Sequence, residues 1–503
     1  MFDKALNWID KNLLILLLAI LAMRGLFLWN IGLDLIGDES YYWDWSRRPA
    51  WCYYSKPPMV AWLIGVFTWL FGDYTPVVRL PTVLLGTVFL AYFHATAKAF
   101  YGARAAALAL LLILATPINV LANFLMTIDP PLYCFWIMTL YYLRRALFDA
   151  DGKAWLWAGC ANAAALLSKQ AALALPAMLL LFLLIDSGRR AYLKRDYWLY
   201  LMPMVFVALP ILWWNQQHEW VMFGHSKGHF GNHEPVGVLK RLQHGRDFVL
   251  YQLLLLSPVT FGLSVVISFK DALGFKRLTA EQQFLWLMGP LLVLAVLLLG
   301  FLQKAQGNWP MPFYISALIL LAGHWADGAW GKAIKWALGV GFFMVGTTYM
   351  LPFLLQAFDL KESAYDPTTR FKSWQQTALN MHSERLAVQT DLADTFVVAL
   401  GHRYLASQLA FYLPDHPNVY RFEESGKVIS QYEVWPGPDA FVGKNAFIVG
   451  EGQQKNLPLA LKNAFARFRF LAEIPNPNNA KSPYRIYWGE NLIAWPELAE
   501  RAR

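Results

Sequence analysis

Long apolar runs without polar alternation recur along the first 356 residues, among them LLILLLAILAMRGLFLWNIGL, LLVLAVLLLGFL and ALGVGFFMVGTTYMLPFLL. Several approach the ~20 residues that a helix needs to cross ~30 Å of hydrocarbon. Unbroken runs favour α-helices over a membrane β-barrel, whose strands alternate apolar and polar positions. The pattern predicts membrane-spanning helices near residues 11–31, 77–98, 104–123, 128–148, 155–168, 171–186, 198–214, 248–269, 284–302, 310–326 and 332–356.

These runs predict a mainly α fold, a polytopic transmembrane helix bundle of about 11–13 spans with interfacial loops outside the membrane. The exact number stays open because the segments on either side of residue 169 are short. The apolar stretch PPMVAWLIGVFTWLFG is also long enough to enter the bilayer. We assign residues 1–356 to this transmembrane domain and read the first run as a retained helix, since no small-residue cleavage site follows it.

Residues 357–503 have a different pattern. TFVVALGHRYLASQLAFYLPDHPNVYRF predicts a strand, an amphipathic helix and a second strand, and NAFIVGEG and SPYRIYWGENL predict further strands. The segment contains no glycine-rich phosphate loop and no HExxH motif. We therefore predict a small α/β domain outside the cytoplasm over residues 357–503.

Composition supports the membrane assignment. The chain is 57% hydrophobic and only 15% charged, and its net charge is +9. In a polytopic membrane protein such an excess of Lys and Arg reflects cytoplasmic loops and anionic lipid rather than nucleic acid. The cysteines Cys52, Cys134 and Cys160 have neither metal-site spacing nor a disulfide framework, so we expect them to be packing residues.

Charge also gives the loops a side. Short connections hold basic clusters at Lys98/Arg104, Arg144/Arg145/Lys153, Arg189/Arg190/Lys194/Arg195 and Lys270/Lys276/Arg277. The positive-inside rule assigns these clusters to the cytoplasm. The loop with Asp38 and Lys56, the turn before Asp129, the turn at Lys169, loop 215–247 and the loop QKAQGNW then share the opposite side. Any one of them could be an ordinary hydrated loop, but together they predict a site at the outer membrane–water interface.

The first outer loop, GDESYYWDWSRRPAWCYYSKPP, combines two adjacent carboxylates with aromatic and basic residues. This combination suits attack by an acceptor on a sugar whose leaving group is a lipid phosphate. Asp38 or Glu39 would take the acceptor proton, and lysines or arginines would stabilise the departing phosphate. Two alternatives remain open: the aromatics fit an interfacial belt as well as sugar stacking, and Asp38 could cap the helix that follows it.

This loop resembles the first external loop of the membrane glycosyltransferases of the C superfamily. It is most similar to the branch that holds the lipid A aminoarabinose transferase and the rhizobial galacturonic acid transferases of lipopolysaccharide, and more distantly to the protein O-mannosyltransferases. The shared pattern is an acidic pair, here residues 38–39, and a Tyr-x-x-Pro-Pro element, here residues 54–58. MTIDPPLYCFW, LLSKQAALALP, GNWPMPFY and SQYEVWPGPDAF carry further similarity.

The resemblance implies roles for individual residues. It makes Asp38 the catalytic carboxylate, with Glu39 as the second choice, and Lys56 and Lys169 the ligands of the donor phosphate. Arg246 is a further candidate for the phosphate. The predicted substrate-binding residues are Tyr41, Tyr54, Asp129, His225, His229, Asn308 and Trp309.

The resemblance further implies a polyprenyl-phosphate-linked sugar as donor and membrane lipid as surroundings, with lipid A or lipopolysaccharide core as acceptor and a protein hydroxyl as the alternative. It places the protein in a bacterial inner membrane, with the active site and the C-terminal domain in the periplasm.

Metal dependence stays open. Some relatives have a Glu that can ligate a metal before the Lys-Pro-Pro, whereas this chain has Ser55. Loop 215–247 holds His218, His225, His229, His233 and His244, whose spacing matches no compact metal motif. We therefore predict no metal ligands, although a divalent ion remains possible as a cofactor.

Two other classes of protein also fit part of the pattern. A transporter of lipid-linked glycans would be polytopic too, but it would be expected to show broken spans in matching repeats and a site at the midplane. A non-catalytic envelope scaffold would give no reason for Lys56 and Lys169 to share a side with Asp38.

Overall fold

The computed structural model describes residues 2–230, 237–326, 331–358, 366, 368–389, 391–452, 457–476, 479 and 482–496. Two compact units form. We name the first the bundle unit; it comprises Met1–Trp29, Arg79–Trp213 and Gly228–Leu351. We name the second the sheet unit; it comprises Asn30–Val78, Trp214–Lys227 and Pro352–Arg503. The sheet unit thus includes two segments from the N-terminal half, and the domain boundary expected at residues 356–357 stays a prediction.

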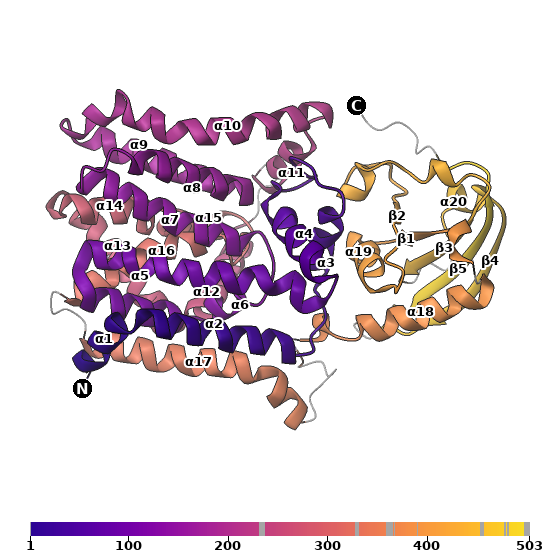
Figure 1. The fold of residues 1–503 in the computed structure, drawn as a ribbon, viewed down its shortest axis with the longest axis horizontal. Helices are drawn as coiled ribbons and strands as arrows, with labels where there is room; N and C mark the ends of the chain where they lie inside the picture. Colours follow the sequence, from indigo (N-terminus) through magenta and orange to yellow (C-terminus); the bar gives the residue numbers. More distant parts are fainter. Residues whose placement is uncertain are drawn as a thin grey trace. The chain divides into compact units, whose positions relative to one another are not determined.

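Helices make up the bundle unit, and Figure 1 shows the longer ones running side by side. They are α1 (Phe2–Lys11), α2 (Leu13–Asn30), α5 (Thr75–Leu114), α6 (Pro117–Leu121), α7 (Asp129–Phe148), α8 (Ala154–Ser168), α9 (Ala174–Ile185), α10 (Asp196–Gln217), α11 (Val221–Phe230), α12 (Val238–Leu256), α13 (Pro258–Leu273), α14 (Ala280–Met288), α15 (Pro290–Leu302), α16 (Met311–Ala326) and α17 (Gly331–Ala357). Five of these helices extend partly into the sheet unit: α2, α5, α10, α11 and α17. Short 3₁₀ helices η1 (Gln170–Leu173), η2 (Arg189–Leu193) and η3 (Phe275–Arg277) join some of them.

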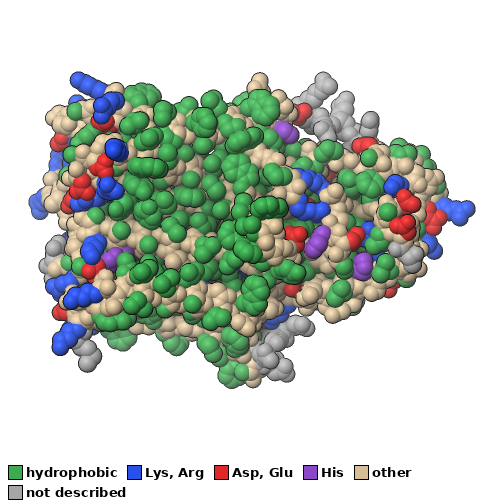
Figure 2. Space-filling model, viewed as in Figure 1, with side chains coloured by type: hydrophobic (Ala, Val, Ile, Leu, Met, Phe, Trp, Pro, Cys, Tyr) green, Lys and Arg blue, Asp and Glu red, His purple; other side chains and the backbone are tan. Residues whose placement is uncertain are grey.

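The surface of the bundle unit is apolar. Figure 2 shows hydrophobic side chains spread over its outer face. Phe206 and Phe343 of this unit are 76% and 74% exposed. By length and hydropathy alone, five described helices can cross a membrane, or six if one bent pair counts as a single span. Shorter apolar helices lie at Met59–Phe71, Ala154–Ser168, Gln170–Ile185 and Met311–Ala326. The helical, membrane-spanning fold class is confirmed, whereas the count of about 11–13 spans stays a prediction.

The prediction of a continuous helix is wrong for one expected span. The sequence pattern predicted a single crossing at residues 248–269, but α12 and α13 meet at an angle of 112°. Ser257, between them, has φ 82° and ψ 148° and is followed by Pro258. A residue before proline is driven away from helical dihedrals, so the helix breaks there.

One end of the bundle unit collects basic residues, as Figure 2 shows at its left side. Arg144 at the end of α7 lies 3.8 Å from Glu281 of α14, and Arg189 of η2 donates to the side chain of Gln283 at 3.0 Å. The end of α7, the α9–α10 connection and the start of α14 therefore meet. This is the arrangement that the charge pattern predicted for one side of a membrane.

The sheet unit contains the predicted α/β domain. Its elements are α3 (Gly37–Ser46), α4 (Met59–Phe71), η4 (Thr369–Phe371), α18 (Trp374–Val388), η5 (Leu392–Asp394), β1 (Thr395–Leu400), α19 (Arg403–Tyr412), β2 (Val419–Phe422), η6 (Gln431–Glu433), η7 (Asp439–Phe441), β3 (Asn445–Glu451), α20 (Leu459–Asn463), β4 (Phe465–Ile474) and β5 (Tyr484–Leu492). The strands form one sheet in the order β2-β1-β3-β5-β4. β1 pairs in parallel with β2 and β3, and β5 pairs antiparallel with β3 and β4.

The burial of β1 agrees with its central position in the sheet. All six residues of β1, TFVVAL, are buried, as expected for a central parallel strand that is covered on both faces. The strand–helix–strand order predicted from TFVVALGHRYLASQLAFYLPDHPNVYRF is confirmed as β1, α19 and β2. The first residue of α19 follows β1 after two residues, so the sheet fixes where α19 begins.

Helices α3 and α19 pack against each other within the sheet unit. Small residues face each other at the contact: the hydroxyls of Ser40 and Ser407 lie 2.9 Å apart, and both residues are fully buried. Gln408 donates to the carbonyl of Leu35 at 2.8 Å just before α3 begins. The start of the first outer loop is thereby held against a helix of the C-terminal domain.

Candidate active site

Asp38 lies in the first turn of α3, and its partners come from α19. The hydroxyl of Tyr404 donates to Oδ1 of Asp38 at 2.9 Å, and a guanidinium nitrogen of Arg403 lies 3.9 Å from the same oxygen. The Asp38 side chain keeps 38% of its area exposed. The carboxylate is therefore held on one side by the protein and remains accessible on another.

Gly37 makes room for this contact. A Cβ atom at Gly37 would lie 2.2 Å from Cγ of the Tyr404 ring, far inside van der Waals contact. Only glycine at this position lets the ring lie against the start of α3 and its hydroxyl reach Asp38. The N-terminus of α19 is fixed in turn, because the His402 side chain accepts from the backbone N–H of Tyr404 at 3.4 Å.

The surroundings of Asp38 disfavour its charged form. Burial among protein atoms raises the pKa of Asp38, while the Tyr404 hydrogen bond and the positive charges of Arg403 and Lys56 partly offset that rise. Burial also raises the pKa of Tyr404 to about 12, aided by the negative charge of Asp38. Tyr404 therefore stays protonated as the donor, and Asp38 has the raised pKa that suits a general base.

Glu39 has a different environment from Asp38. Its side chain is fully buried and accepts from the backbone N–H of Ile36 at 3.1 Å. Glu39 thus satisfies a donor at the start of α3, while Asp38 makes no such contact and is not the N-cap residue. Of the two predicted acids, Asp38 alone presents its carboxylate to an accessible space.

Lys56 belongs to the same unit as Asp38 and lies close enough to it to influence its ionisation electrostatically. Its backbone carbonyl accepts from the N–H of Tyr53 at 3.1 Å, which closes a tight turn around Ser55. The turn fixes the position of the Lys-Pro-Pro element relative to the rest of the loop. Lys56 therefore adds positive charge near the carboxylate, as expected for a residue that contacts an anion.

The aromatic residues of the first loop are mostly core residues. Tyr41 is 2% exposed and its hydroxyl accepts from the N–H of Gln431 at 2.5 Å, and Trp45 stacks on Tyr53 at 4.4 Å between ring centroids. Tyr54 is less buried, and its ring lies 4.9 Å from that of His225. The structure thus brings the predicted residues Tyr54 and His225 together, but it leaves little of the Tyr41 ring for a ligand.

The bundle unit holds a second cluster around Asp129. Nζ of Lys169 donates to Oδ1 of Asp129 at 2.9 Å, and the side-chain amide of Asn308 donates to Oδ2 at 2.6 Å. Lys169 and Asp129 are each 13% exposed. Three residues predicted separately, from three different loops, therefore form one hydrogen-bonded cluster.

Helix ends position this cluster. Asp129 is the first residue of α7, before two prolines that fit the opening turn, and Lys169 is the C-cap of α8. α7 and α8 are neighbours joined by a short connection, so the start of one meets the end of the other. A carboxylate at a helix N-terminus and an ammonium at a helix C-terminus also complement the two helix dipoles.

Two buried polar groups lie next to these residues in the chain. The hydroxyl of Tyr133, one turn after Asp129, and the side-chain nitrogen of Gln170, next to Lys169, have no hydrogen-bond partner among the described residues. Buried donors normally have partners. These two donors are therefore available for an anionic or hydroxylated ligand at this end of the bundle unit.

Arg246 and Trp309 have other contacts in the structure. Arg246 of α12 is 66% exposed and pairs with its neighbour Asp247 at 2.8 Å. Nε1 of Trp309 donates to the side chain of Gln306 at 3.2 Å. His229 belongs to α11, and His233 lies outside the described residues. The roles proposed for Arg246, Trp309 and His229 stay predictions.

No metal site is evident in the part of the chain that the structure describes, since no three His, Cys, Asp or Glu residues gather there. His218 stacks on Trp214 at 4.0 Å and contacts the carbonyl of that residue at 2.7 Å. His218 therefore has a packing partner in the same helical segment.

The sequence analysis missed Arg403 and Tyr404. Both follow the end of a buried parallel strand, in the segment GHRY, and this is where α/β sheets commonly carry ligand-contacting residues. That rule would have selected the segment, but nothing local in the sequence connects it to Asp38.

Solved structures share the fold of this chain. Over 95% of this chain and 98% of the other, the structure matches ArnT from Cupriavidus metallidurans bound to undecaprenyl phosphate, with a TM-score of 0.64 at 17% identity. The apo state of the same protein matches with a TM-score of 0.62 at 18% identity, with the same coverage of both chains. The chain therefore has the fold of ArnT, and with its apolar helices it is a multi-pass membrane protein.

Sequence comparisons point the same way. Residues 55–214 match the family described as dolichyl-phosphate-mannose-protein mannosyltransferase. The chain is also 28% identical over 330 residues to the lipid A galacturonosyltransferase RgtD of Rhizobium johnstonii, which covers 64% of this chain and 67% of that protein. These matches confirm the resemblance to membrane glycosyltransferases that the first loop indicated.

Proposed function

We propose that the protein is an integral-membrane glycosyltransferase that moves a single sugar from a polyprenyl-phosphate donor to an envelope acceptor, lipid A or the lipopolysaccharide core. RgtD is named for lipid A, and the ArnT structure holds undecaprenyl phosphate. The observation that carries the proposal is the accessible carboxylate of Asp38, held by Tyr404 and flanked by the positive charge of Arg403 and Lys56.

In the proposed reaction, the acceptor hydroxyl attacks the anomeric carbon of the donor sugar. Asp38 takes the proton of that hydroxyl as the new bond between carbon and oxygen forms. The bond between the anomeric carbon and the phosphate oxygen breaks, and the polyprenyl phosphate leaves with the electron pair. Positive charge that is already in place would stabilise this leaving group in the transition state.

Lys56 and Lys169 are the proposed ligands of the donor phosphate. They belong to different units, so each role is tested separately. For Lys169, the observation in favour is that the side-chain donors of Tyr133 and Gln170, which lie near Asp129 and Lys169 in the chain, have no hydrogen-bond partner among the described residues. Donor phosphate would compete with Asp129 for the same ammonium group, which makes Asp129 a holder of Lys169 in the unliganded protein.

We also place the active site and the C-terminal domain in the periplasm of a bacterium, with the protein in the inner membrane. Support comes from the basic end of the bundle unit, which the positive-inside rule assigns to the cytoplasm. Polyprenyl-linked donors suit this side, because soluble nucleotide sugars are absent there.

The activity is tested with purified full-length protein in lipid bilayers. Undecaprenyl-phosphate donors carrying galacturonic acid, aminoarabinose or mannose are each combined with lipid A, with lipid A bearing core sugars, and with a Ser/Thr-rich peptide. We expect sugar transfer to a lipid acceptor, detected by mass spectrometry. Transfer to the peptide alone would show that the acceptor is a protein hydroxyl and not a lipid. Donor movement across the bilayer without sugar transfer would show that the protein is a transporter and not a glycosyltransferase.

Orientation has its own experiment. Single cysteines replace exposed serines in a background that lacks Cys52, Cys134 and Cys160: Ser187→Cys in the α9–η2 turn and Ser383→Cys in α18. An impermeant thiol reagent added to cells with a permeable outer membrane should label residue 383 and leave residue 187 unlabelled. Equal labelling of both would refute the periplasmic placement.

A further inference from the structure

The sheet unit contains a cavity of about 500 Å³ that no step above uses. It lies beside the sheet around β2 and the segment that follows it, and the chain returns to it near residue 495. Five aromatic residues line it: Tyr420, Phe422, Tyr432, Trp435 and Trp495. A cavity of this size falls within the range of small-ligand sites.

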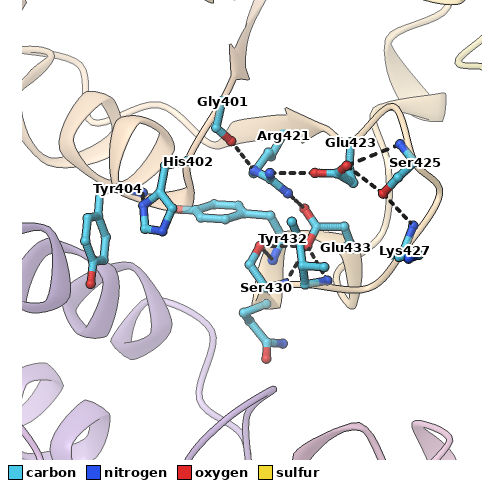
Figure 3. A network of polar contacts seen from close by, with 12 residues as sticks. Gly401, His402, Tyr404, Arg421, Glu423, Ser425, Lys427, Ser430, Tyr432 and Glu433 are labelled. Carbon is cyan, nitrogen blue, oxygen red and sulfur yellow. Dashed lines mark hydrogen bonds and ion pairs between the residues drawn. The ribbon is translucent and has the colours of Figure 1, made fainter. Parts of the chain in front are cut away.

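Figure 3 shows a network of polar contacts whose charged members Arg421, Glu423 and Glu433 line the cavity. The Arg421 guanidinium donates to the carbonyl of Gly401 at 2.7 Å and to a carboxylate oxygen of Glu423 at 2.7 Å, and it also bonds Glu433. Glu433 in turn accepts from the backbone N–H and the hydroxyl of Ser430. Arg421 is 5% exposed at its side chain, so this network is prearranged and rigid.

Glu423 keeps acceptor capacity within this network. Burial alone would raise the pKa of Glu423, but hydrogen bonds from Ser425 and the Arg421 charge outweigh it and hold the pKa below its usual value. The group is therefore an ionised acceptor at neutral pH. A carboxylate has about four lone-pair positions, and Arg421 and Ser425 occupy three of those of Glu423.

Further polar groups at the cavity lack partners. In the described part of the chain, neither the carboxylate of Asp439 nor the ammonium of Lys427 has a hydrogen-bond or ion-pair partner, and both residues are exposed. The hydroxyl of Tyr420 and the indole N–H of Trp435 are also without hydrogen-bond partners in this set. Donors and acceptors thus alternate around the cavity instead of forming one charged patch.

The indole of Trp435 is held in place although it lines the cavity. The guanidinium of Arg48 stacks over its ring at 4.0 Å, and the Tyr432 ring packs against it edge-on at 5.4 Å. Trp495 closely approaches the backbone on the other side: a Cβ at Gly437 would lie 3.3 Å from Cδ1 of Trp495. Two fixed indoles therefore border the same space.

Rigid aromatic faces with interleaved donors and acceptors match the surface of a sugar ring, which has apolar faces of C–H groups and a rim of hydroxyls that both donate and accept. We propose that this cavity is a saccharide-binding subsite that holds an uncharged sugar residue of the acceptor glycan. This proposal rests on the proposed function. Three carboxylates and two cations line it, so a phosphorylated or acidic sugar is disfavoured.

Two sets of contacts within the sheet unit link the cavity to the helices that carry Asp38 and Tyr404. Gly401, whose carbonyl Arg421 contacts, immediately precedes His402, the N-cap of the helix that carries Tyr404. The hydroxyl of Tyr432 donates at 2.7 Å to Asp44, which lies on α3 as Asp38 does. A glycan held here would be bound by the same elements that hold the proposed base, which suits an acceptor subsite better than a donor subsite.

The binding test uses the full-length protein in detergent without any donor. Saturation-transfer difference NMR is recorded with N,N′-diacetylchitobiose, mannobiose and galactobiose, and with glucose 1-phosphate as the charged probe. We expect signals from ring protons of at least one neutral disaccharide and weaker signals from glucose 1-phosphate. Trp435→Ala and Asp439→Ala should each reduce the disaccharide signal at least threefold.

Trp374→Ala is the matched control. Trp374 is a half-buried tryptophan of the same unit on α18 and does not line the cavity, so this variant should keep the wild-type signal. Asp439 is exposed and has no hydrogen-bond or ion-pair partner among the described residues, so we expect Asp439→Ala to fold normally and to decide the question if Trp435→Ala fails to fold. Absence of any disaccharide signal in the wild type, or unchanged signals in Asp439→Ala, would overturn the subsite.

Transfer kinetics separate this inference from the proposed function. With an acceptor that carries neutral core sugars, Asp439→Ala should raise the acceptor KM at least threefold and leave kcat unchanged. Wild-type protein that transfers no sugar would refute the proposed function, while the NMR result remains readable. Normal transfer with an unchanged KM in Asp439→Ala would refute the subsite alone.

Discussion

In the bundle unit, Asp129 receives an ammonium on one oxygen and an amide on the other, whereas in the sheet unit Asp38 receives one neutral hydroxyl and keeps an accessible side. Both carboxylates open a helix, so the helix terminus does not distinguish them. Their partners do. Asp129 has both oxygens engaged by protein donors, whereas Asp38 keeps an accessible side and burial raises its pKa despite the charges of Arg403 and Lys56.

From this difference we infer a holding role for Asp129 and a chemical role for Asp38. Asp129 fixes Lys169 and the loop that carries Asn308, so it shapes the bundle unit. Glu39 holds the backbone at the start of α3, whereas Asp38 contacts Tyr404 and Arg403 of α19. The predictions below test this division.

The largest expected effect is that of Asp38→Asn. It removes the base but keeps the size of the side chain and an oxygen to accept from Tyr404, so kcat should fall by about 10² to 10⁴ with folding and donor binding retained. Single-turnover transfer, donor titration and thermal unfolding measure the three quantities. Turnover at near the wild-type rate in a stable protein that binds donor would refute the catalytic role.

Glu39→Gln is the matched control for that variant. The Gln side chain can still accept from the N–H of Ile36, so activity should change by less than about threefold. A dead Glu39→Gln enzyme beside an active Asp38→Asn enzyme would exchange the roles of the two acids.

The next effect is that of Lys169→Ala. Loss of the proposed phosphate contact should weaken donor binding by about tenfold or more, and the unpaired Asp129 should lower the free energy of unfolding by about 1–3 kcal/mol. Donor titration and chemical denaturation measure the two changes.

A double variant sharpens this prediction. Asp129→Asn with Lys169→Met removes both charges, so stability should largely return while donor binding stays weak. Recovery of donor binding together with stability would leave Lys169 with a structural role only.

A smaller effect is expected of Tyr404→Phe, and it shows in the pH profile. Asp38 acts deprotonated, so kcat/KM rises with pH through its pKa. Because the Tyr404 hydroxyl lowers that pKa, its loss should move the acid limb to higher pH and reduce the rate at neutral pH by about threefold. An acid limb that stays in place would show that Asp38 does not control it.

The sequence predicted much of this arrangement for physical reasons that act locally. Apolar runs predicted most of the helices, and the sides assigned by charge correctly brought Asp129, Lys169 and Asn308 to one end of the bundle unit. Ser257 was missed although the proline after it gave a usable signal. The burial of Tyr41 could not be predicted, because a tyrosine near a membrane surface looks the same in sequence whether it packs or stacks.

The partners of Asp38 could not be predicted from the sequence. Tyr404 is 366 residues away along the chain, and no residue near either position marks the pairing. Their contact depends on β1, on the room that Gly37 provides and on the packing of α19 against α3. These are properties of the folded sheet unit rather than of any local segment.

That long separation has a consequence for the birth of the protein in the cell. The ribosome makes Asp38 early and Tyr404 late, and β3 and β5, which complete the sheet, later still. A nascent or truncated chain can insert most of its helices while the proposed base lacks its tyrosine. Until the last hundred residues or so are translated, the proposed base would lack the hydroxyl that contacts it, and the sheet that fixes the start of α19 would be incomplete.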